Sequence, residues 1–155
     1  MSASTAIGLG AISGLRSMSG PALVSRAAAN GSLPLEHTPL SFLGSPLVSK
    51  ILLVAALGEL VGDKLPANPS RTATPPLLGR VVSGALVGAA VFASGGRRAA
   101  FGAVLGSSAA VAAAFAGERL RALAGEKTGL PDPVFALVED AVVLLVGLRL
   151  LRAVR

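Results

Sequence analysis

The chain contains no cysteine, tryptophan or tyrosine, and a single histidine among its 155 residues. Without cysteine it forms no disulfide, no thiolate nucleophile and no cysteine-ligated metal site. With His37 as its one histidine, it also lacks a metal site built from several histidines. The Walker loop, the G-x-S-x-G elbow and the H-E-x-x-H zinc motif are absent as well. We therefore expect no metal, no cofactor and no enzymatic activity.

Charged residues are scarce, at 14% of the chain, against about 25% in a typical soluble domain. Hydrophobic residues make up 52%, and a chain of this length cannot bury so much apolar surface in one water-soluble core. The surplus must face lipid or another chain. The sequence thus predicts a single integral membrane domain over residues 1–155, in contact with the lipid bilayer.

The formal net charge is +6, which would suggest a nucleic-acid partner for a soluble protein. Here the basic residues are scattered with no aromatic residues among them, so we expect no nucleic acid. Lys and Arg are better explained as markers of helix ends beside anionic lipid. Arg far exceeds Lys, and Ala and Gly are abundant, as in GC-rich bacteria. The expected location is the bacterial inner membrane, with several crossings.

The predicted fold is all-α: a polytopic helical membrane bundle with about five hydrophobic segments, each near the roughly 20 residues that a crossing helix needs. The segments cover roughly residues 5–26, 46–62, 77–95, 99–123 and 134–151. No basic residue precedes the first segment and Arg16 interrupts it, so we expect it to be retained rather than cleaved as a signal peptide. Because Gly20 and Pro21 break helices, this segment is predicted to be interrupted between residues 17 and 21.

Small residues recur at four-residue spacing, which lets helix backbones approach closely. The pairs are Gly10 with Gly14, Gly84 with Gly88, and Gly102 with Gly106. Two interpretations stay open: tight packing within the chain, or a seam between two copies. Because five short helices offer little interior of their own, we also expect a homo-oligomer. Its simplest form is a homodimer, with the last four of these glycines as its closest-packed positions.

Two stretches of the sequence resemble two later ones. Residues 10–14 resemble residues 102–106, and residues 56–59 resemble residues 136–139. If every segment crosses, the two copies run in opposite directions, which is the inverted repeat of many transporters. The glycine pattern at residues 84–88 fits equally well, so composition alone can produce the match.

Ionisable residues within apolar helices are costly, so each needs a partner or a wet cavity. Five of them are predicted to form a binding site for a small solute or ion: Arg16, Glu59, Asp63, Glu139 and Asp140. Secondary candidates are Ser13, Ser17, Lys64 and Arg71. Segment three carries no charge between Arg80 and Arg97, and segment four carries none between Arg98 and Glu118. The counter-charges of Arg16 must therefore come from segments two and five. The alternative is structural, with the same charges acting as ion pairs that set helix register.

Three functions fit these features. The leading one is a small transporter or channel, whose intramembrane carboxylates couple it to protons or cations. The second is a non-catalytic membrane scaffold or assembly factor. The third is a membrane enzyme acting on a lipid, for which the single histidine is poor support.

Several motifs together resemble a known family. They are residues 13–16 (Ser-Gly-Leu-Arg), Pro21-Ala22, residues 58–64 with Pro66, Pro69 and Arg71, Arg80 with residues 83–85, and Glu139-Asp140. This combination resembles the uncharacterised bacterial membrane family called domain of unknown function 4126. The resemblance covers nearly the whole chain and implies a membrane location, without implying an activity.

Overall fold

The computed structural model describes residues 2–62, 72–128 and 132–152. These residues form helices with no β-strand among them, so the predicted all-α class is confirmed. The helices are α1 (Ala3–Leu15), α2 (Ser19–Ala29), the 3-10 helix η1 (Ser41–Gly44), α3 (Pro46–Gly62), α4 (Thr74–Ser94), α5 (Ala99–Thr128) and α6 (Asp132–Arg152).

The expected bundle of five crossing segments is not confirmed. Within the described ranges, α4 and α5 are the two helices long and apolar enough to cross a membrane by length and composition. The first predicted segment is instead two short helices, α1 with 13 residues and α2 with 11. At 1.5 Å per residue they extend over about 20 and 17 Å, whereas the hydrocarbon core of a bilayer is about 30 Å thick.

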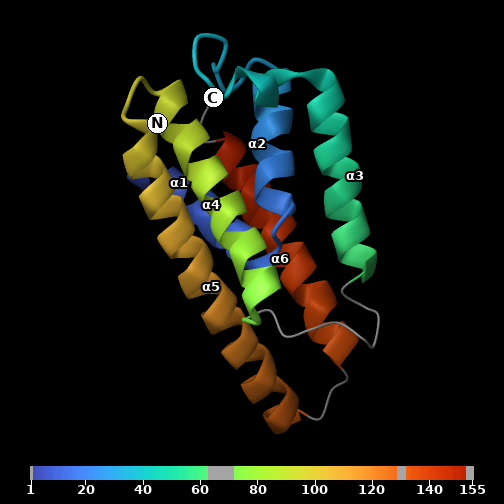
Figure 1. Ribbon diagram of the computed structural model, residues 1–155. Coiled ribbons are helices and arrows are strands. Elements are labelled where there is room, and N and C mark those ends of the chain that lie inside the picture. The colour runs from blue at the N-terminus through green and yellow to red at the C-terminus, as the bar shows by residue number, and fades with distance from the viewer. Residues whose placement is uncertain (1, 63–71, 129–131, 153–155) are drawn as a thin grey trace.

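Helices α1 and α2 form a hairpin that enters the bundle and returns to the same end. In Figure 1, α1 descends from the N-terminal end and α2 rises again from the break between them. α3 then descends, α4 rises, α5 descends and α6 rises. Both termini therefore lie at the upper end, together with the loop after α2 and the turn between α4 and α5 (Figure 1). Helices α3, α4, α5 and α6 thus alternate in direction, whereas the α1–α2 hairpin extends only part of the way along the bundle (Figure 1).

Helices α1, α4 and α5 pack with their backbones in close contact. A Cβ added at Gly10 would collide with the backbone of Gly106, and one at Gly88 with the backbone of Gly102. The spaced glycines thus serve packing within the chain. Gly84, Gly88, Gly102 and Gly106 are all buried. The expectation that they form a dimer seam is wrong, because helices of the same chain already occupy that smooth face. We call this three-helix contact the glycine seam.

The apolar core lies in the upper half of the bundle, where the loop after α2 covers it. Leu33, Leu35 and Leu43 of the loop and η1 are each at most 2% exposed. The Ser25 hydroxyl of α2 donates a hydrogen bond to the Leu43 carbonyl at 2.6 Å, which binds η1 to α2. A tight turn joins α4 and α5, with Gly96 at a φ of 67° that favours glycine.

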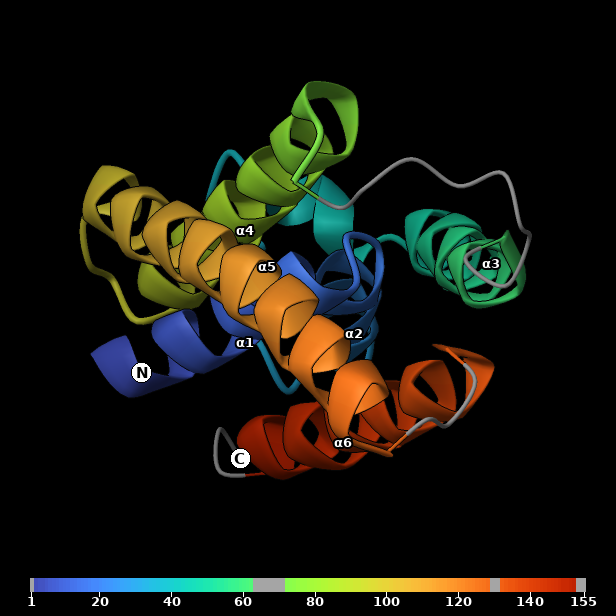
Figure 2. The same ribbon diagram turned by 90° about the horizontal axis from the view of Figure 1, so that it is seen from below.

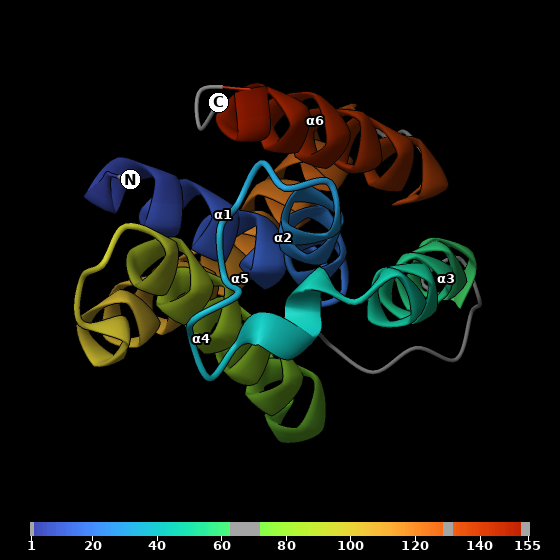
Figure 3. The same ribbon diagram turned by 90° about the horizontal axis from the view of Figure 1, so that it is seen from above.

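Helix α6 lies across α1 and α2, whereas α3 stands at the periphery. One face of α6 points inward, formed by Ala136, Asp140, Val143 and Gly147, at the spacing of a single helix face. α3 packs against α2 and η1. Figure 2 and Figure 3 show α3 set apart from α4, α5 and α6 in both views.

The inverted repeat is not supported. The segment expected to correspond to the broken α1–α2 hairpin is α5, a continuous helix of 30 residues. Pro21 lies in the hairpin, and no proline occurs in α5, so the backbone of α5 has no comparable reason to break. α5 also continues to Thr128, beyond the predicted end of its segment near residue 123.

Candidate functional site

The candidate site forms where α1 ends and α2 begins. Residues 16–18 separate the two helices, and Arg16 has an extended backbone with φ −137° and ψ 107°. In a continuous helix the ring of Pro21 would clash with the carbonyl of Ser17, four residues earlier. Pro21 lies instead in the first turn of α2, where a backbone N–H has no helical partner. The predicted break is thereby confirmed, at the N-terminal edge of its expected range.

Glu59 of α3 closes the N-terminal end of α2. Its Oε1 accepts hydrogen bonds from the Ser17 backbone N–H and the Ser17 hydroxyl, and its Oε2 accepts one from the Met18 backbone N–H, each at 2.8 Å. The N–H groups at the start of a helix lack helical partners and carry the positive end of the helix dipole. A carboxylate satisfies both the unpaired donors and the positive potential.

A cation closes the opposite helix end in the same way. The Arg80 Nε of α4 donates a hydrogen bond to the Gly14 carbonyl of α1 at 2.9 Å. The last carbonyls of a helix lack helical donors and carry the negative end of the dipole, which favours a basic side chain. Arg80 is only 4% exposed. Each end of the broken helix therefore meets a charge of opposite sign that comes from another helix.

Arg16 pairs with Asp140 of α6. Its Nη2 lies 2.6 Å from the Asp140 Oδ1, and the two side chains are 0% and 11% exposed. Removing one partner of a buried ion pair is strongly destabilising, because it leaves a charge in a poorly hydrated place. This pair thus joins α6 to the break from one side, while Glu59 joins α3 to it from the other.

Glu139 and Asp140 are neighbours in sequence that serve different contacts. Successive residues of an α-helix point about 100° apart, so both cannot face the break. Asp140 faces it, whereas the Glu139 Oε2 lies 2.7 Å from the Arg121 Nη2 of α5. The Arg121–Glu139 pair is less buried, at 19% and 14% exposure.

The break lies about midway along the uncharged part of α5. A Cβ at Gly14 would meet the backbone of Ala110, which places the end of α1 beside that residue. Ala110 lies about 17 Å from the start of α5 at Ala99. The first charged residue of α5 is Glu118, which lies about 12 Å further along the helix.

The structure brings together some of the predicted residues and separates others. Arg16, Asp140 and Ser17 meet at the break, and Glu59 reaches it through Ser17 and Met18. Direct contact between Glu59 and the Arg16 guanidinium, which the sequence had suggested, is replaced by these backbone contacts.

The remaining predicted residues are elsewhere. Ser13 donates to the Leu9 carbonyl of its own helix at 3.2 Å. Asp63, Lys64 and Arg71 lie outside the described residues.

Sequence reasoning missed two members of the arrangement. Arg80 was assigned to the end of its segment, although it lies one and a half turns inside α4. Its signal was present, since an arginine within an apolar stretch needs a partner. The backbone donors of Ser17 and Met18 left no signal in the side-chain pattern.

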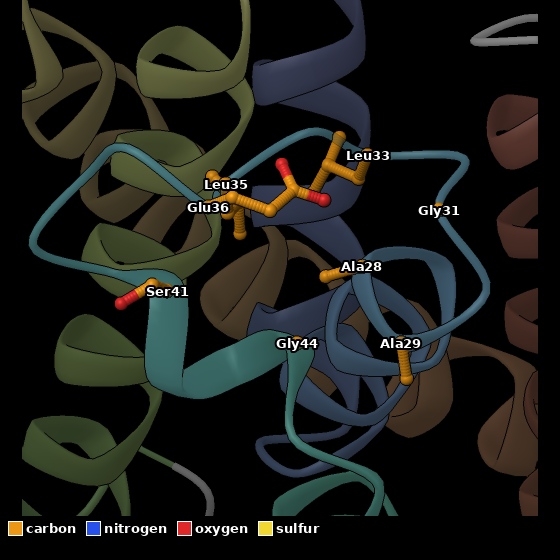
Figure 4. A pocket seen from close by; sticks show the side chains of 8 residues that line it. All are labelled: Ala28, Ala29, Gly31, Leu33, Leu35, Glu36, Ser41 and Gly44. Atoms are coloured by element: carbon orange, nitrogen blue, oxygen red, sulfur yellow. The ribbon is translucent and has the colours of Figure 1, made fainter.

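A pocket of about 340 Å³ lies at the other end of α2. Figure 4 shows the residues that line it: Ala28, Ala29, Gly31, Leu33, Leu35, Glu36, Ser41 and Gly44. The carboxylate of Glu36 points toward Leu33 and is the single charged group of this lining. We place the candidate site at the break, because the break gathers charges of both signs from several helices. Across the described part of the chain, no group of three or more Asp, Glu or His side chains gathers that could hold a metal ion.

The fold and the site define a class: a protein whose described residues are all-helical, with a broken helix held by charged side chains and with two helices long and apolar enough to cross a membrane. The chain belongs to the family described as domain of unknown function (DUF4126), whose family model matches residues 3–153. The resemblance of the motifs to this family is thereby confirmed. No curated protein and no solved structure matches the chain.

Proposed function

We propose that this protein is an integral membrane transporter or channel for a small solute or ion, with the break between α1 and α2 as its binding site. The observation that supports this most is the pairing of both broken helix ends with charges from other helices, Glu59 on α2 and Arg80 on α1. Transporters commonly place their sites at such discontinuous helices, near the middle of the bilayer.

The exposed surface supports a membrane location. Large apolar side chains face outward on every long helix, including Val54 at 68%, Val82 at 65% and Leu145 at 64% exposure. The most apolar windows of α4 and α5 are only 44% and 22% buried within the chain, unlike the core helix of a soluble protein. In water this surface would invite aggregation, whereas lipid satisfies it.

The position of the break supports a functional role within that membrane. Irregular backbone at membrane depth persists only where protein buries it or where it lines a wet cavity. Charges at that depth are costly and usually mark pathways for ions or substrates. The break combines both features about midway along the uncharged part of α5, where a solute crossing the bilayer would have to pass.

We place the chain in the inner membrane of a bacterium, which it crosses several times. Both termini lie at the same end of the bundle (Figure 1), so this arrangement puts them on the same side of the membrane. Reporter fusions at each terminus test this, and fusions that report opposite sides of the membrane would contradict it.

Ion flux into vesicles tests the proposed function. The purified protein is reconstituted in vesicles, and uptake of protons, potassium and chloride is followed after a gradient of each ion is imposed. We expect flux of at least one of these ions, and at least a tenfold loss in Glu59→Gln and in Asp140→Asn. The matched control is Glu126→Gln, an exposed carboxylate near the end of α5. Absence of flux, or equal flux in all variants, would count against a transport site for these ions at the break.

The second candidate is a membrane scaffold, and a specific observation favours it. Arg16 is fully buried against Asp140, and Glu59 makes three hydrogen bonds, as expected of contacts that only set helix register. In that case Glu59→Gln lowers the melting temperature in detergent without any effect on flux. Self-association belongs to either candidate and must use a surface other than the glycine seam. A mass measurement in detergent that finds only monomer would exclude it under those conditions.

A further inference from the structure

We infer that α3 is a movable gate beside the break, and that Glu59 is the latch that holds this gate closed. The role of the gate in transport rests on the proposed function. The movement of α3 does not, because it can be measured without any flux.

Helix α3 has very little packing of its own. Only Ser49 and Ala56 are buried among its 17 residues, and both are small. A Cβ added at Gly58 or Gly62 would meet no atom within 4 Å. The neighbours of α3 are α2 and η1, so it has no extensive contact with α4, α5 or α6. Shape complementarity therefore does little to hold this helix in place.

The apolar side chains of α3 hold its first half better than its second. Val48 and Leu52 are partly buried and pack against the core. Val54, Leu57 and Val61 are 68%, 54% and 69% exposed. In a bilayer an apolar side chain has little preference between a protein neighbour and a lipid tail, so helix association depends on close packing and on polar contacts. Because the second half of α3 has little close packing, with a single small buried residue, the position of this half depends mainly on polar contacts.

Glu59 supplies that polar contact at one end of the helix. It lies in the last turn of α3 and makes three hydrogen bonds to Ser17 and Met18 across the break. Hydrogen bonds to an ionised acceptor are about twice as strong as those between neutral groups. The far end of α3 begins at Pro46, directly after η1, and η1 is bound to α2 through Ser25 and Leu43. α3 is thus hinged at its start and latched at its end.

Release of the latch has a consequence for the site. With Glu59 withdrawn, the Ser17 N–H, the Ser17 hydroxyl and the Met18 N–H lose their acceptor. The positive end of α2 then opens toward the space that the end of α3 had covered. The same carboxylate therefore controls both the position of α3 and access to the break.

Distances between spin labels test the latch, and the absence of cysteine allows labels to be placed at chosen positions. One labelled pair, Val54→Cys on α3 with Leu145→Cys on α6, reports movement of α3. The other pair, Val82→Cys on α4 with Val104→Cys on α5, reports the glycine seam. All four positions are at least 60% exposed. In nanodiscs, we expect Glu59→Ala to lengthen and broaden the α3–α6 distance, and to leave the α4–α5 distance unchanged.

Three further variants sharpen the test. Lys50→Ala removes an exposed charge from the same helix and should alter neither distance. Ser17→Ala removes one of the three hydrogen bonds and should broaden the α3–α6 distance less than Glu59→Ala. Glu59→Gln keeps the size of the side chain and replaces Glu59→Ala if that variant does not fold.

Two results would overturn the latch: an unchanged α3–α6 distance in both Glu59 variants, or an equal shift of both labelled pairs. Movement of α3 without any ion flux in the wild-type protein would support the latch and reject the proposed function. If ion flux is lost in Glu59→Gln while the α3–α6 distance stays unchanged, the proposed function is supported and the latch is rejected.

Discussion

In the glycine seam, the backbones of α1, α4 and α5 touch one another, whereas α3 stands beside α2 with two small buried residues and one carboxylate. Both regions consist mainly of Ala, Gly, Leu and Val. In the seam, the glycines face one another across the interface, as Gly88 and Gly102 do. In α3, Gly58 faces open space. Identical residue types therefore produce a rigid contact in one place and a loose one in the other.

The difference teaches which interactions order an apolar bundle. Lipid competes equally well for exposed Leu and Val, so hydrophobicity alone does not choose a neighbour. Close approach of two backbones does determine which helices are neighbours, because a lipid tail cannot reproduce its density of contacts. A charged group at a helix end also determines the neighbour, since lipid offers that group no counter-charge. The glycine seam is held by close backbone packing, and the two sides of the break are held by charged groups at helix ends.

The largest effect is expected from Asp140→Ala. This change deprives the fully buried Arg16 of a counter-charge, and breaking a buried ion pair from one side costs about 3 kcal/mol or more. The matched variant is Glu139→Ala, which affects the less buried pair with Arg121 and should cost clearly less. Thermal unfolding in detergent, followed by circular dichroism, measures both. Equal losses of thermal stability in the two variants would show that the deeper burial of the Arg16–Asp140 pair adds nothing to its contribution.

A smaller loss is expected from Gly88→Val. The added side chain would collide with the backbone of Gly102, and neither helix can yield without disturbing the seam. Overpacking of this kind costs about 1–3 kcal/mol. The same unfolding measurement applies, and the α4–α5 label pair should also report a longer distance. An unchanged melting temperature would mean that α4 and α5 are free to separate.

The smallest effect, with the opposite sign, is expected from Gly58→Ala in α3. A Cβ at this position meets no atom within 4 Å, so it adds no clash. Alanine also restricts the backbone more than glycine does, and favours a helix interior by about 0.5 kcal/mol. The melting temperature should stay unchanged or rise slightly. A clear loss of stability would show that another surface covers this face of α3, which would contradict its peripheral position.

Several features followed from the sequence because they depend on local chemistry. Pro21 cannot take its place in a continuous helix, so the break near residues 17–21 was predictable from the covalent structure of one residue. The boundaries of α3 match the predicted segment 46–62, since Pro46 can begin a helix and the apolar run continues to Gly62. The four-residue spacing of glycines likewise predicted close helix contacts.

Other features were decided only when the helices came together. The sequence contained the charges of the site but did not determine their pairing. Arg16 pairs with Asp140 rather than with Glu59, because α6 turns Asp140 inward and Glu139 toward α5. The glycines could serve one chain or two until α1 occupied their face. The partners of Glu59 are backbone N–H groups, which every residue has, and which become available only where a helix begins. Side-chain patterns report what a residue can bind, whereas the direction in which each helix face points, and which donors a helix leaves unpaired, depend on the packing of the whole bundle.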